Sequence, residues 1–283
     1  MPHRDWHEAN RASWNSATEA HNSHKRDQAA FLRMGGSTLY PEEIELLGDL
    51  RGKSLVHLQC NSGQDSLSLA RLGVMVTGVD ISDIAIAFAQ ALSTETGIPA
   101  TFERADIFDW MESTFLLFDL AFSSYGALVW LSDLNIWARG IAQVLKPGGR
   151  FVVVDFHQAL MMFGENWQLT YDYMGGTHLT FDGVGDYVAL TGDALTPSGY
   201  EQGVVDFVNP HPAHEFCWGV ADIVSALLDA GLRLEVLREY PFTNGFKPFS
   251  DMRELPGGRF GMPEGMPQLP MMLGVRAQKP FAL

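Results

Sequence analysis

A strand–loop–helix–strand unit that ends on an acidic residue constrains the fold of this chain more than any other feature. Residues 54–58 form an apolar run suited to a buried parallel strand, and a short polar loop follows at 59–63. Apolar residues then recur on one helix face over 65–72, and 74–79 is a second run rich in β-branched residues. The next residue, Asp80, lies where a ribose presents its two hydroxyls at the end of such a strand. The unit therefore predicts a nucleoside-containing cofactor at the carboxyl edge of an open α/β sheet.

The composition of the loop narrows the type of cofactor. A dinucleotide site typically uses G-x-G-x-x-G, because the pyrophosphate requires close backbone approach and the dipole of a helix N-terminus. Here the loop holds a single glycine, Gly63, and no lysine or arginine lies between Lys53 and Arg71. These residues favour a cofactor that has an amino-acid tail and no phosphate.

The segment from His57 to Gly63 reads H-L-Q-C-N-S-G and resembles D-L-G-x-G-x-G, the first motif of class I S-adenosylmethionine (SAM) dependent methyltransferases. His57 stands where the family has an acid, and Gln59 and Asn61 stand where it has its first two glycines. Asparagine tolerates the left-handed backbone conformation that glycine adopts, so Asn61 is a suitable replacement. Glutamine has no such preference, and the path of the loop at Gln59 stays open.

Further segments resemble later motifs of this family, in the order in which the family has them. They are the ribose-binding acid, the acidic adenine site after the third strand, the fourth strand with the active-site lip, and the turn into the fifth strand. In this chain they read D-I-S at 80–82, A-D-I at 105–107, F-D-L-A-F-S-S-Y at 118–125 and L-K-P-G-G-R-F at 145–151. The resemblance spans roughly residues 37–156, with a weaker echo over 216–278.

The resemblance implies a cofactor site with a role for each motif. The loop would hold the methionine end of SAM through its backbone, Asp80 would bind the ribose, and Asp106 would contact the adenine. The predicted cofactor residues are Trp14, Gln59, Cys60, Asn61, Gly63, Asp65, Ser66, Asp80, Ile81, Asp106, Ile107 and Ser123. The alternatives are an ordinary strand-to-helix turn, a helix cap, for which Ser82 is the better candidate, and plain core packing of the isoleucines.

Strands and helices alternate along the middle of the chain, which is typical of a parallel sheet covered on both faces. The pattern predicts strands at 54–59, 74–79, 100–105, 117–123 and 149–156, and helices at 63–72, 83–96 and 133–145. The fold class is α/β, a Rossmann-like, mostly parallel sheet with helices on both faces and a β-rich cap insertion after the fifth strand. The chain divides into an N-terminal helical lid (1–40), a SAM-binding core (41–156), the cap insertion (157–215) and a C-terminal completion of the core (216–283).

The cap insertion is rich in Gly, Asp and aromatic residues and is too long for a simple connection. Alternating residues at 187–190 and 204–207 predict short strands within it. Beyond it, the pattern predicts a helix at 220–230, a strand at 232–240, a loop or lid over 241–270 and a last strand at 271–277.

Composition limits the classes of function. The chain has 283 residues, of which 46% are hydrophobic and 19% charged, as is ordinary for a globular protein. The formal net charge of −15 argues against a nucleic-acid partner, because phosphate contacts need clustered lysine and arginine. The sequence shows neither a membrane span, which needs ~18 consecutive apolar residues, nor an apolar signal core, nor a disulfide framework. We therefore expect a cytoplasmic protein that acts on a small molecule, with neither a nucleic-acid nor a membrane partner; a homodimer is possible.

Methyl transfer from a sulfonium is an in-line displacement, so positioning provides much of the rate, and a base is needed only if the acceptor must lose a proton. His157 follows the predicted fifth strand and Tyr125 lies on the lip of the fourth, at the edge where open sheets carry their active sites. We predict both as catalytic and substrate-contacting residues; a structural histidine and a packing tyrosine are the alternatives. The other predicted substrate contacts are Trp167, Tyr171, Tyr187, His214 and Glu215.

The cluster of His211, His214 and Glu215 has the spacing of metal ligands, but a closed zinc site needs four ligands and the sequence offers no convincing partner set. We expect no metal. The sequence thus predicts a SAM-dependent methyltransferase that acts on a small-molecule acceptor, whose identity and acceptor atom it does not encode. The alternatives are a SAM-binding enzyme that does not methylate, such as an aminopropyl transferase, and a non-catalytic SAM-binding protein.

Overall fold

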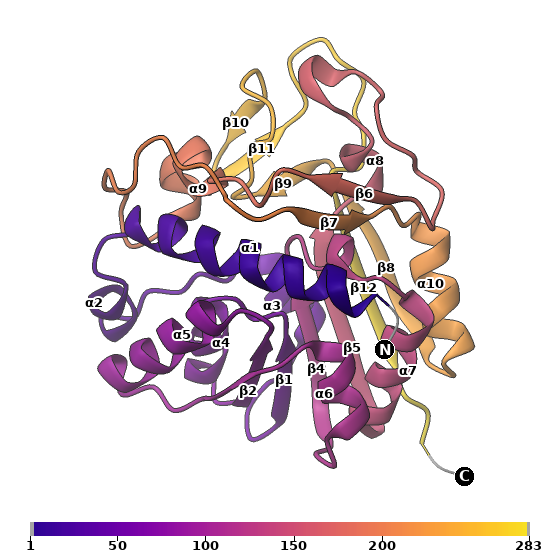
Figure 1. Ribbon diagram of the computed structural model, residues 1–283. Helices are drawn as coiled ribbons and strands as arrows, with labels where there is room; N and C mark the ends of the chain where they lie inside the picture. Colours follow the sequence, from indigo (N-terminus) through magenta and orange to yellow (C-terminus); the bar gives the residue numbers. More distant parts are fainter. Residues whose placement is uncertain (1–2, 282–283) are drawn as a thin grey trace.

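The apolar runs in the middle of the chain form the parallel part of a seven-stranded sheet (Figure 1). The computed structural model describes residues 3–281. The parallel strands are β1 (Ser54–Leu58), β2 (Met75–Asp80), β3 (Thr101–Arg104), β4 (Phe118–Ser124) and β5 (Leu145–Phe156). The sheet order is β3-β2-β1-β4-β5-β12-β8, where β12 (Met272–Gln278) runs antiparallel between β5 and β8 (Arg233–Tyr240). The prediction of a Rossmann-like, mostly parallel sheet is confirmed.

Both faces of the sheet are buried, because successive residues of each central strand point to opposite faces. Val56 and Phe151 pack against one layer of helices, whereas Leu55 and Val152 pack against the other. This two-sided burial explains why the strands are continuous apolar runs. The helices that cover the sheet are α3 (Pro41–Leu47), α4 (Gln64–Arg71), α5 (Asp83–Thr96), α6 (Ile107–Ser113), α7 (Leu134–Val144) and α10 (Val220–Asp229).

The N-terminal segment forms helices α1 (Arg4–Ser23) and α2 (Gln28–Arg33). Helix α1 crosses the molecule between the sheet below it and the cap insertion above it (Figure 1). Asn22 donates to the Ser62 hydroxyl at 2.9 Å, and Asn10 exchanges two hydrogen bonds with the backbone of His214. Helix α1 therefore links the loop after β1 to the cap insertion.

The cap insertion contains less strand than the pattern predicts. It holds one antiparallel pair, β6 (His178–Phe181) with β7 (Ala213–Phe216), and the short helices α8 (Gln158–Met161), η2 (Glu165–Trp167), α9 (Tyr187–Thr191) and η3 (Gly192–Leu195). The predicted strand at 187–190 is wrong, because this segment is helix α9. Asp186 accepts a hydrogen bond from the Ala189 amide at 3.1 Å, and this N-cap starts a helix in spite of the β-branched and aromatic residues that follow.

The predicted strand at 204–207 is also wrong. The amides of Gly203 and Val204 donate to the side chains of His24 and Ser23, at 3.1 and 2.9 Å, instead of pairing with a neighbouring strand. Conversely, the stretch 241–270, predicted as a loop or lid, contains a small sheet. Its strands are β9 (Phe242–Asn244), β10 (Arg253–Leu255) and β11 (Arg259–Gly261), in the order β10-β11-β9.

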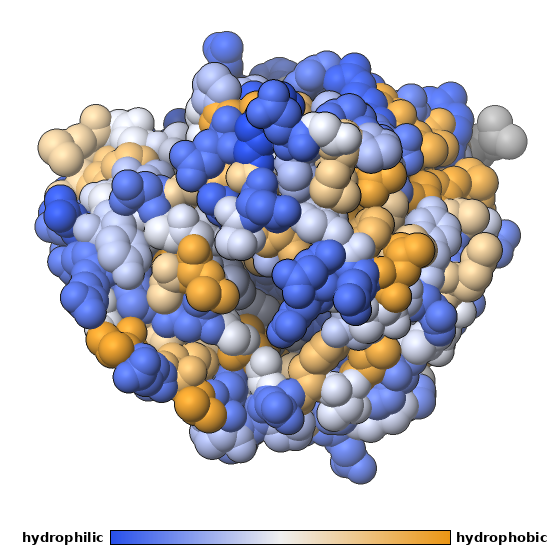
Figure 2. Space-filling view, turned by 90° about the horizontal axis from the view of Figure 1, so that it is seen from above, coloured by the Kyte–Doolittle hydropathy of each residue, from blue (hydrophilic) through white to orange (hydrophobic). Residues whose placement is uncertain are grey.

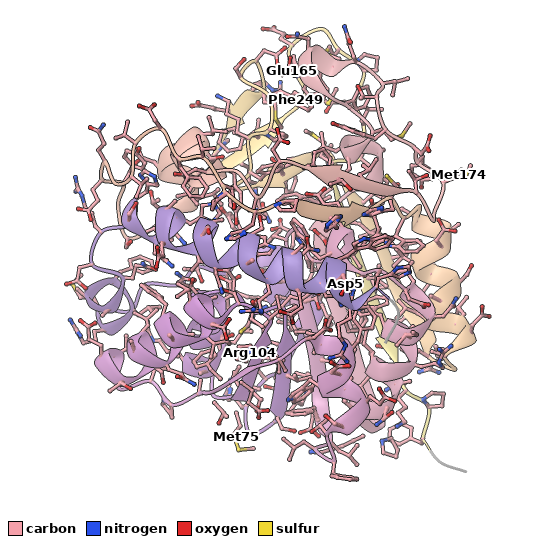
Figure 3. All side chains as sticks on the ribbon, viewed as in Figure 1. Asp5, Met75, Arg104, Glu165, Met174 and Phe249 are labelled. Atoms are coloured by element: carbon pink, nitrogen blue, oxygen red, sulfur yellow. The ribbon has the colours of Figure 1, made fainter. Side chains whose placement is uncertain are left out.

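This small sheet and the cap insertion form the upper part of the molecule. Phe249, from the stretch before β10, and Glu165, from the insertion, lie near each other at the top (Figure 3). Trp167 packs against Phe249 there, with ring centroids 4.0 Å apart and the rings tilted by 33°. Seen from above, hydrophobic side chains are scattered among hydrophilic ones, and this face is hollowed near its centre (Figure 2). Over residues 3–281, none of the helices combines the length and the apolar composition that a bilayer crossing requires.

Candidate cofactor and acceptor site

A large cavity lies at the carboxyl edge of the parallel strands. Its volume is about 900 Å³, near the upper end of the range of about 300–1,000 Å³ for small-molecule sites. The loop after β1 and the ends of β2 and β4 line one side, and α1, the cap insertion and residues near β9 and β11 line the rest. A second cavity of about 260 Å³ shares part of its wall.

The loop after β1 alternates left-handed residues. Gln59, Asn61 and Gly63 have φ angles of 58°, 47° and 77°. Gln59 and Asn61 thus adopt glycine-like backbone conformations at the two positions where the family motif has its first glycines. Gly63 is also sterically required, because a Cβ there would lie 2.6 Å from that of Ala89. The loop keeps the path of a glycine-rich turn with fewer glycines.

Asp80, at the end of β2, lines the cavity and is held before any ligand binds. Its carboxylate accepts hydrogen bonds from the amides of Asn61 and Ser82, each at 2.8 Å. Burial raises the pKa of this carboxyl, while those amides lower it. Ser82, the better candidate for the helix cap, does cap α5 by accepting from the Ala85 amide at 3.0 Å. Asp80 therefore keeps acceptor capacity for a ligand.

Asp106 also lines the cavity, but its carboxylate already has two partners. One oxygen accepts from the Phe108 amide at 2.9 Å, and the other lies 2.5 Å from Nδ1 of His7. An adenine contact through this carboxylate would therefore compete with His7. Ile81 and Ile107 line the same part of the cavity wall.

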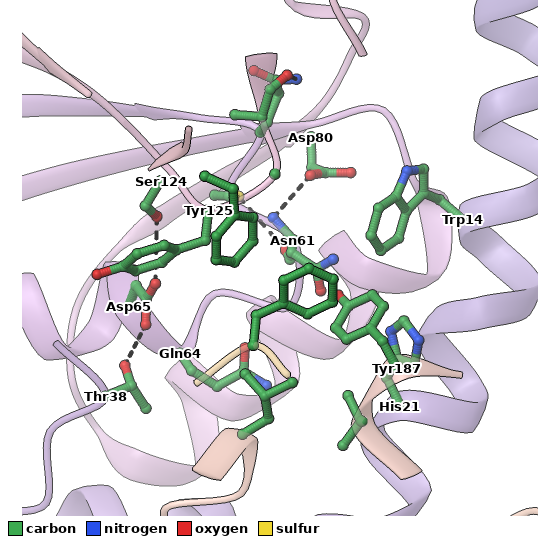
Figure 4. A pocket seen from close by; sticks show the side chains of 18 of the residues that line it. Trp14, His21, Thr38, Asn61, Gln64, Asp65, Asp80, Ser124, Tyr125 and Tyr187 are labelled. Carbon is green, nitrogen blue, oxygen red and sulfur yellow. Dashed lines mark hydrogen bonds between the residues drawn. The ribbon is translucent and has the colours of Figure 1, made fainter. Parts of the chain in front are cut away.

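Aromatic residues from α1 and α9 meet across the cavity from Asp80 (Figure 4). Trp14 and His21 come from α1, and the ring of Tyr187 lies 4.2 Å from that of His21. Burial lowers the pKa of His21 to about 4, which leaves this imidazole neutral at physiological pH. The predicted positions of Trp14 and Tyr187 beside the cavity are observed, and His21 joins them.

Lys25, which none of the sequence motifs includes, faces the cavity beside the start of α4. Burial lowers the pKa of its ammonium to about 8, against the attraction of Asp65. Asp65 accepts a hydrogen bond from the Thr38 hydroxyl at 2.5 Å (Figure 4). Lys25 is the only lysine before Lys53 in the chain, and this isolated position is the one feature of the sequence that could have indicated a role for it.

Three predicted cofactor residues, Gly63, Ser66 and Ser123, do not line the cavity. Ser66 is fully buried and bonds to Nδ1 of His57 at 2.8 Å, and Ser123 is 1% exposed. His57, which replaces the family acid, lines the cavity but is only 2% exposed, and burial lowers its pKa to about 3. Cys60 and Asp65 do line the cavity.

The lip after β4 is shaped by Asp155 from the end of β5. Its carboxylate accepts hydrogen bonds from the amides of Gly126, Ala127 and Leu128, the last two at 3.0 and 2.8 Å. The Ala127 carbonyl in turn accepts from the Gln59 side chain at 2.9 Å. Asp155 was not predicted as a site residue. Its position as an acid at the carboxyl end of a predicted strand could have indicated one.

Tyr125, on this lip, lines the cavity with a strained backbone angle φ of 38°. Its hydroxyl accepts from the Asn244 amide at 2.9 Å, and Asn244 also donates to Glu42. Burial raises the pKa of Tyr125 and that of nearby Glu43 well above their ordinary values, and the Tyr125 phenol is therefore protonated at neutral pH. Tyr125 is therefore suited to positioning rather than to taking up a proton.

His157 does not face the cavity. It caps α8, with Nδ1 accepting from the Ala159 amide at 3.0 Å and Nε2 lying 2.9 Å from the Glu239 carboxylate. It is 2% exposed and absent from the cavity wall. This geometry corresponds to the structural alternative, a histidine that anchors the insertion.

Of the remaining predicted substrate residues, some line a cavity and others do not. Tyr187 and Glu215 line the large cavity, and Tyr171 lines only the second one. Trp167 donates to Asp251 at 2.9 Å, and Nδ1 of His214 lies 3.0 Å from Nε2 of His178, both outside the cavity walls. Among residues 3–281, no group of three or more His, Cys, Asp or Glu side chains is arranged to hold a metal ion.

Comparison with known proteins finds similar sequences for the middle of the chain. A family model described as a methyltransferase domain matches residues 56–149. The ubiquinone biosynthesis O-methyltransferase of Methylobacterium sp. (strain 4-46) is 29% identical over 135 residues, which cover 48% of this chain and 51% of that protein. The chain thus spans about half the length of this curated relative.

Solved structures extend the likeness to most of the fold. A SAM-dependent methyltransferase from Mesorhizobium loti matches with a TM-score of 0.52 and 23% identity, covering 86% of this chain and 98% of that one. The [4+2]-cyclase SpnF matches with a TM-score of 0.50 and 15% identity, covering 82% of this chain and 77% of that one. At these identities the structural likeness establishes the fold alone. Residues 56–149 therefore match a methyltransferase domain, and the chain shares the Rossmann-like fold of SAM-dependent methyltransferases of known structure.

Proposed function

We propose that this protein transfers a methyl group from SAM to a small-molecule acceptor. The observation that carries the proposal is a cavity bounded by the left-handed loop 59–63 and by Asp80, inside the matched methyltransferase domain. Its volume of about 900 Å³ leaves room for an acceptor beside the cofactor.

The residues on the cavity wall fit SAM at several points. The Oε1 atom of Gln59 is buried without a hydrogen-bond partner among the described residues, and it suits the amino group of the methionine part. Lys25 presents a cation that suits the methionine carboxylate. Asp80 suits the ribose hydroxyls, and Ile81 with Ile107 suits the faces of the adenine.

SAM supplies a methyl group that its sulfonium already activates. The protein's part is then to position the two reactants and to exclude water. Trp14 and Tyr187 enclose the cavity, and Asp155 fixes the lip that carries Tyr125. We assign no general base, because His157 lies outside the cavity and Tyr125 holds its proton at neutral pH.

Three expectations from the sequence remain proposals here. The core, residues 41–156, would determine the donor, and the cap insertion, residues 157–215, would determine the acceptor. The protein would act in the cytoplasm. It would act with neither a nucleic-acid nor a membrane partner; a homodimer is possible.

A second candidate function is a SAM-binding enzyme that does not transfer the methyl group. The observation that favours it is the likeness to SpnF, which is named a [4+2]-cyclase and has the same fold. The two candidates share the cofactor site and differ in the fate of the methyl group.

One experiment separates these functions. Calorimetry with SAM and with S-adenosylhomocysteine tests the site, and mass detection of methylated products from a metabolite extract tests transfer. We expect binding of both cofactor forms and a SAM-dependent gain of one methyl group in a small molecule. Binding without any methylated product would favour the non-methylating enzyme, and tight NAD binding without a response to SAM would refute both.

A further inference from the structure

Glu215 presents a half-buried carboxylate with no partner in the described part of the chain. It lies on β7, and its side chain lines both cavities. No hydrogen bond or ion pair within residues 3–281 involves its carboxylate, whereas the neighbouring His214 is bonded on both its ring and its backbone. Burial raises the pKa of this carboxyl to about 7, so a cation that pairs with it would favour its charged form.

The surroundings of Glu215 are apolar and aromatic. The two cavities share Glu215 and four other wall residues, namely Val129, Met161, Phe181 and Phe246. Val129 belongs to η1 (Leu128–Trp130), which directly follows the lip of β4. Glu215 is therefore the acidic member of an otherwise apolar junction, on the acceptor side of the proposed site.

The charge of the large cavity indicates what kind of group this junction accepts. The acids on its wall are Asp65, Asp80, Asp106, Asp193 and Glu215. Lys25 is the only lysine or arginine that the described residues contribute to the wall, and the carboxylate that attracts it is Asp65. An anionic group at the junction would meet a like charge without a neighbouring cation, whereas a cation would find both a carboxylate and aromatic faces.

We propose that Glu215 binds a protonated amine of the methyl acceptor at the junction of the two cavities, with Phe181 and Phe246 as its aromatic walls. This inference rests on the proposed function, because the amine belongs to the acceptor. The amine is an anchor that positions the acceptor, and the methylated atom is a separate group of the same molecule. A cation stabilises the charged form of Glu215 and a neutral hydroxyl does not, so the site favours a positively charged group.

The test uses the full chain saturated with S-adenosylhomocysteine and three probes of similar shape: benzylamine, benzyl alcohol and benzoate. Calorimetry at neutral pH should show benzylamine binding about tenfold or more tightly than either of the others. Glu215→Gln should reduce benzylamine binding about tenfold or more and leave S-adenosylhomocysteine affinity within about twofold. Asp193→Asn, which removes another acid of the same wall, should leave benzylamine binding unchanged.

Two other results would overturn the inference. Benzyl alcohol that binds as well as benzylamine would show a neutral donor site, and benzylamine binding that survives Glu215→Gln would place the amine elsewhere. If the Glu215→Gln protein does not fold, Glu215→Asp takes its place. The preference of the native protein for benzylamine over benzyl alcohol and benzoate then still tests the inference. Binding of S-adenosylhomocysteine without binding of benzylamine refutes this inference alone, whereas loss of both refutes the proposed function.

Discussion

Asp80 is the residue on which the proposed ribose contact depends. Asp80→Asn removes the charge and turns one acceptor oxygen into a donor that faces the Asn61 or Ser82 amide. Hydrogen bonds to a charged group are worth ~1.5–3 kcal/mol each, so we expect SAM affinity to fall about tenfold or more. Calorimetry measures the loss. The exposed Asp109, replaced by Asn, serves as the control, and equal affinity of the Asp80 variant would place the ribose elsewhere.

Gly63 is needed in the loop for two separate reasons, and a second glycine separates them. Gly97 has a similar φ of 70° but no atom within 4 Å of the position that a Cβ would take, whereas a Cβ at Gly63 would collide with Ala89. Gly97→Ala should therefore cost only left-handed strain, ~1–2 kcal/mol. Gly63→Ala should lower the free energy of unfolding by ~1–3 kcal/mol more, through overpacking. Urea unfolding measures both, and equal losses would contradict the crowding.

Lys25 gives the stability a pH dependence with a definite sign. Burial lowers its pKa from 10.5 to about 8, so between these values the unfolded chain holds a proton that the folded protein has released. The free energy of unfolding contributed by Lys25 should therefore rise from about pH 8 to about pH 10.5. Lys25→Met should remove this rise and be the more stable protein near neutral pH.

Urea unfolding at several pH values measures the free energy of unfolding of the native protein and of Lys25→Met. The difference between the two pH profiles is the contribution of Lys25, because tyrosines that titrate in the same range affect both proteins equally. Lys25→Met should also weaken SAM binding, since it removes the cation assigned to the methionine carboxylate. A variant with the native pH profile would show that the Lys25 ammonium is well solvated.

At the scale of elements, the lip between β4 and η1 depends on a carboxylate from the next strand. Asp155→Ala leaves the amides of Gly126, Ala127 and Leu128 without their acceptor. Each unsatisfied buried group costs ~1–3 kcal/mol, so we expect a loss of several kcal/mol in the free energy of unfolding. Asp119, at the opposite end of β4, pairs with Lys146 at 2.9 Å on the surface. Asp119 also accepts from the Ser54 amide at 2.8 Å, but its side chain is 34% exposed, so water can replace it there. Asp119→Ala should therefore cost less than Asp155→Ala, since an exposed ion pair contributes only ~0–1 kcal/mol.

Urea unfolding of the two variants measures the difference. The Asp155 variant should also bind SAM more weakly, because the displaced lip carries the carbonyl that holds the Gln59 side chain. Equal losses in the two variants would mean that water replaces the Asp155 carboxylate on the lip.

The core elements could be predicted because each follows a local rule. Helix α5 spans Asp83–Thr96, as its periodicity and the cap at Ser82 predict, and β1 ends within a residue of its predicted boundary. The errors at 187–190 and 204–207 arise from contacts that no local window contains. The amides near 204 bind side chains at the end of α1, far away in the sequence, and Asp186, which caps α9, also bonds to His24.

Those residues of the site that belong to a sequence motif could be predicted, and those outside the motifs could not. Asp80 and the left-handed Asn61 follow from the loop pattern, and the left-handed Gln59 does not follow from its residue type. The role of Asp155 depends on amides of the lip that follows β4, and that of Lys25 depends on its position at the cavity after the end of α1. His157 has the position of an active-site residue in the sequence, but the N-cap of α8 turns its ring away from the cavity.

At the scale of the whole molecule, the cavity lies between a core and a cap that are joined by α1. Side chains of α1 bond to the core at Ser62 and to the cap insertion at His214 and Gly185. The helix therefore places the proposed donor and acceptor surfaces against each other. Donor binding and acceptor binding should be separable by substitutions on either side of it.

Phe181 and Trp167 test this division of labour within the cap insertion. Phe181 lines both cavities, whereas Trp167 packs on Phe249 away from them. Phe181→Ala should impair methyl transfer to the identified acceptor about tenfold or more, and leave SAM affinity within a few fold, because it removes a wall that only the acceptor touches. Trp167→Ala should lower the melting temperature through lost packing and leave acceptor selectivity unchanged. Calorimetry and turnover are measured on both variants; if Phe181→Ala abolishes SAM binding, the insertion belongs to the donor site and the proposed division is wrong.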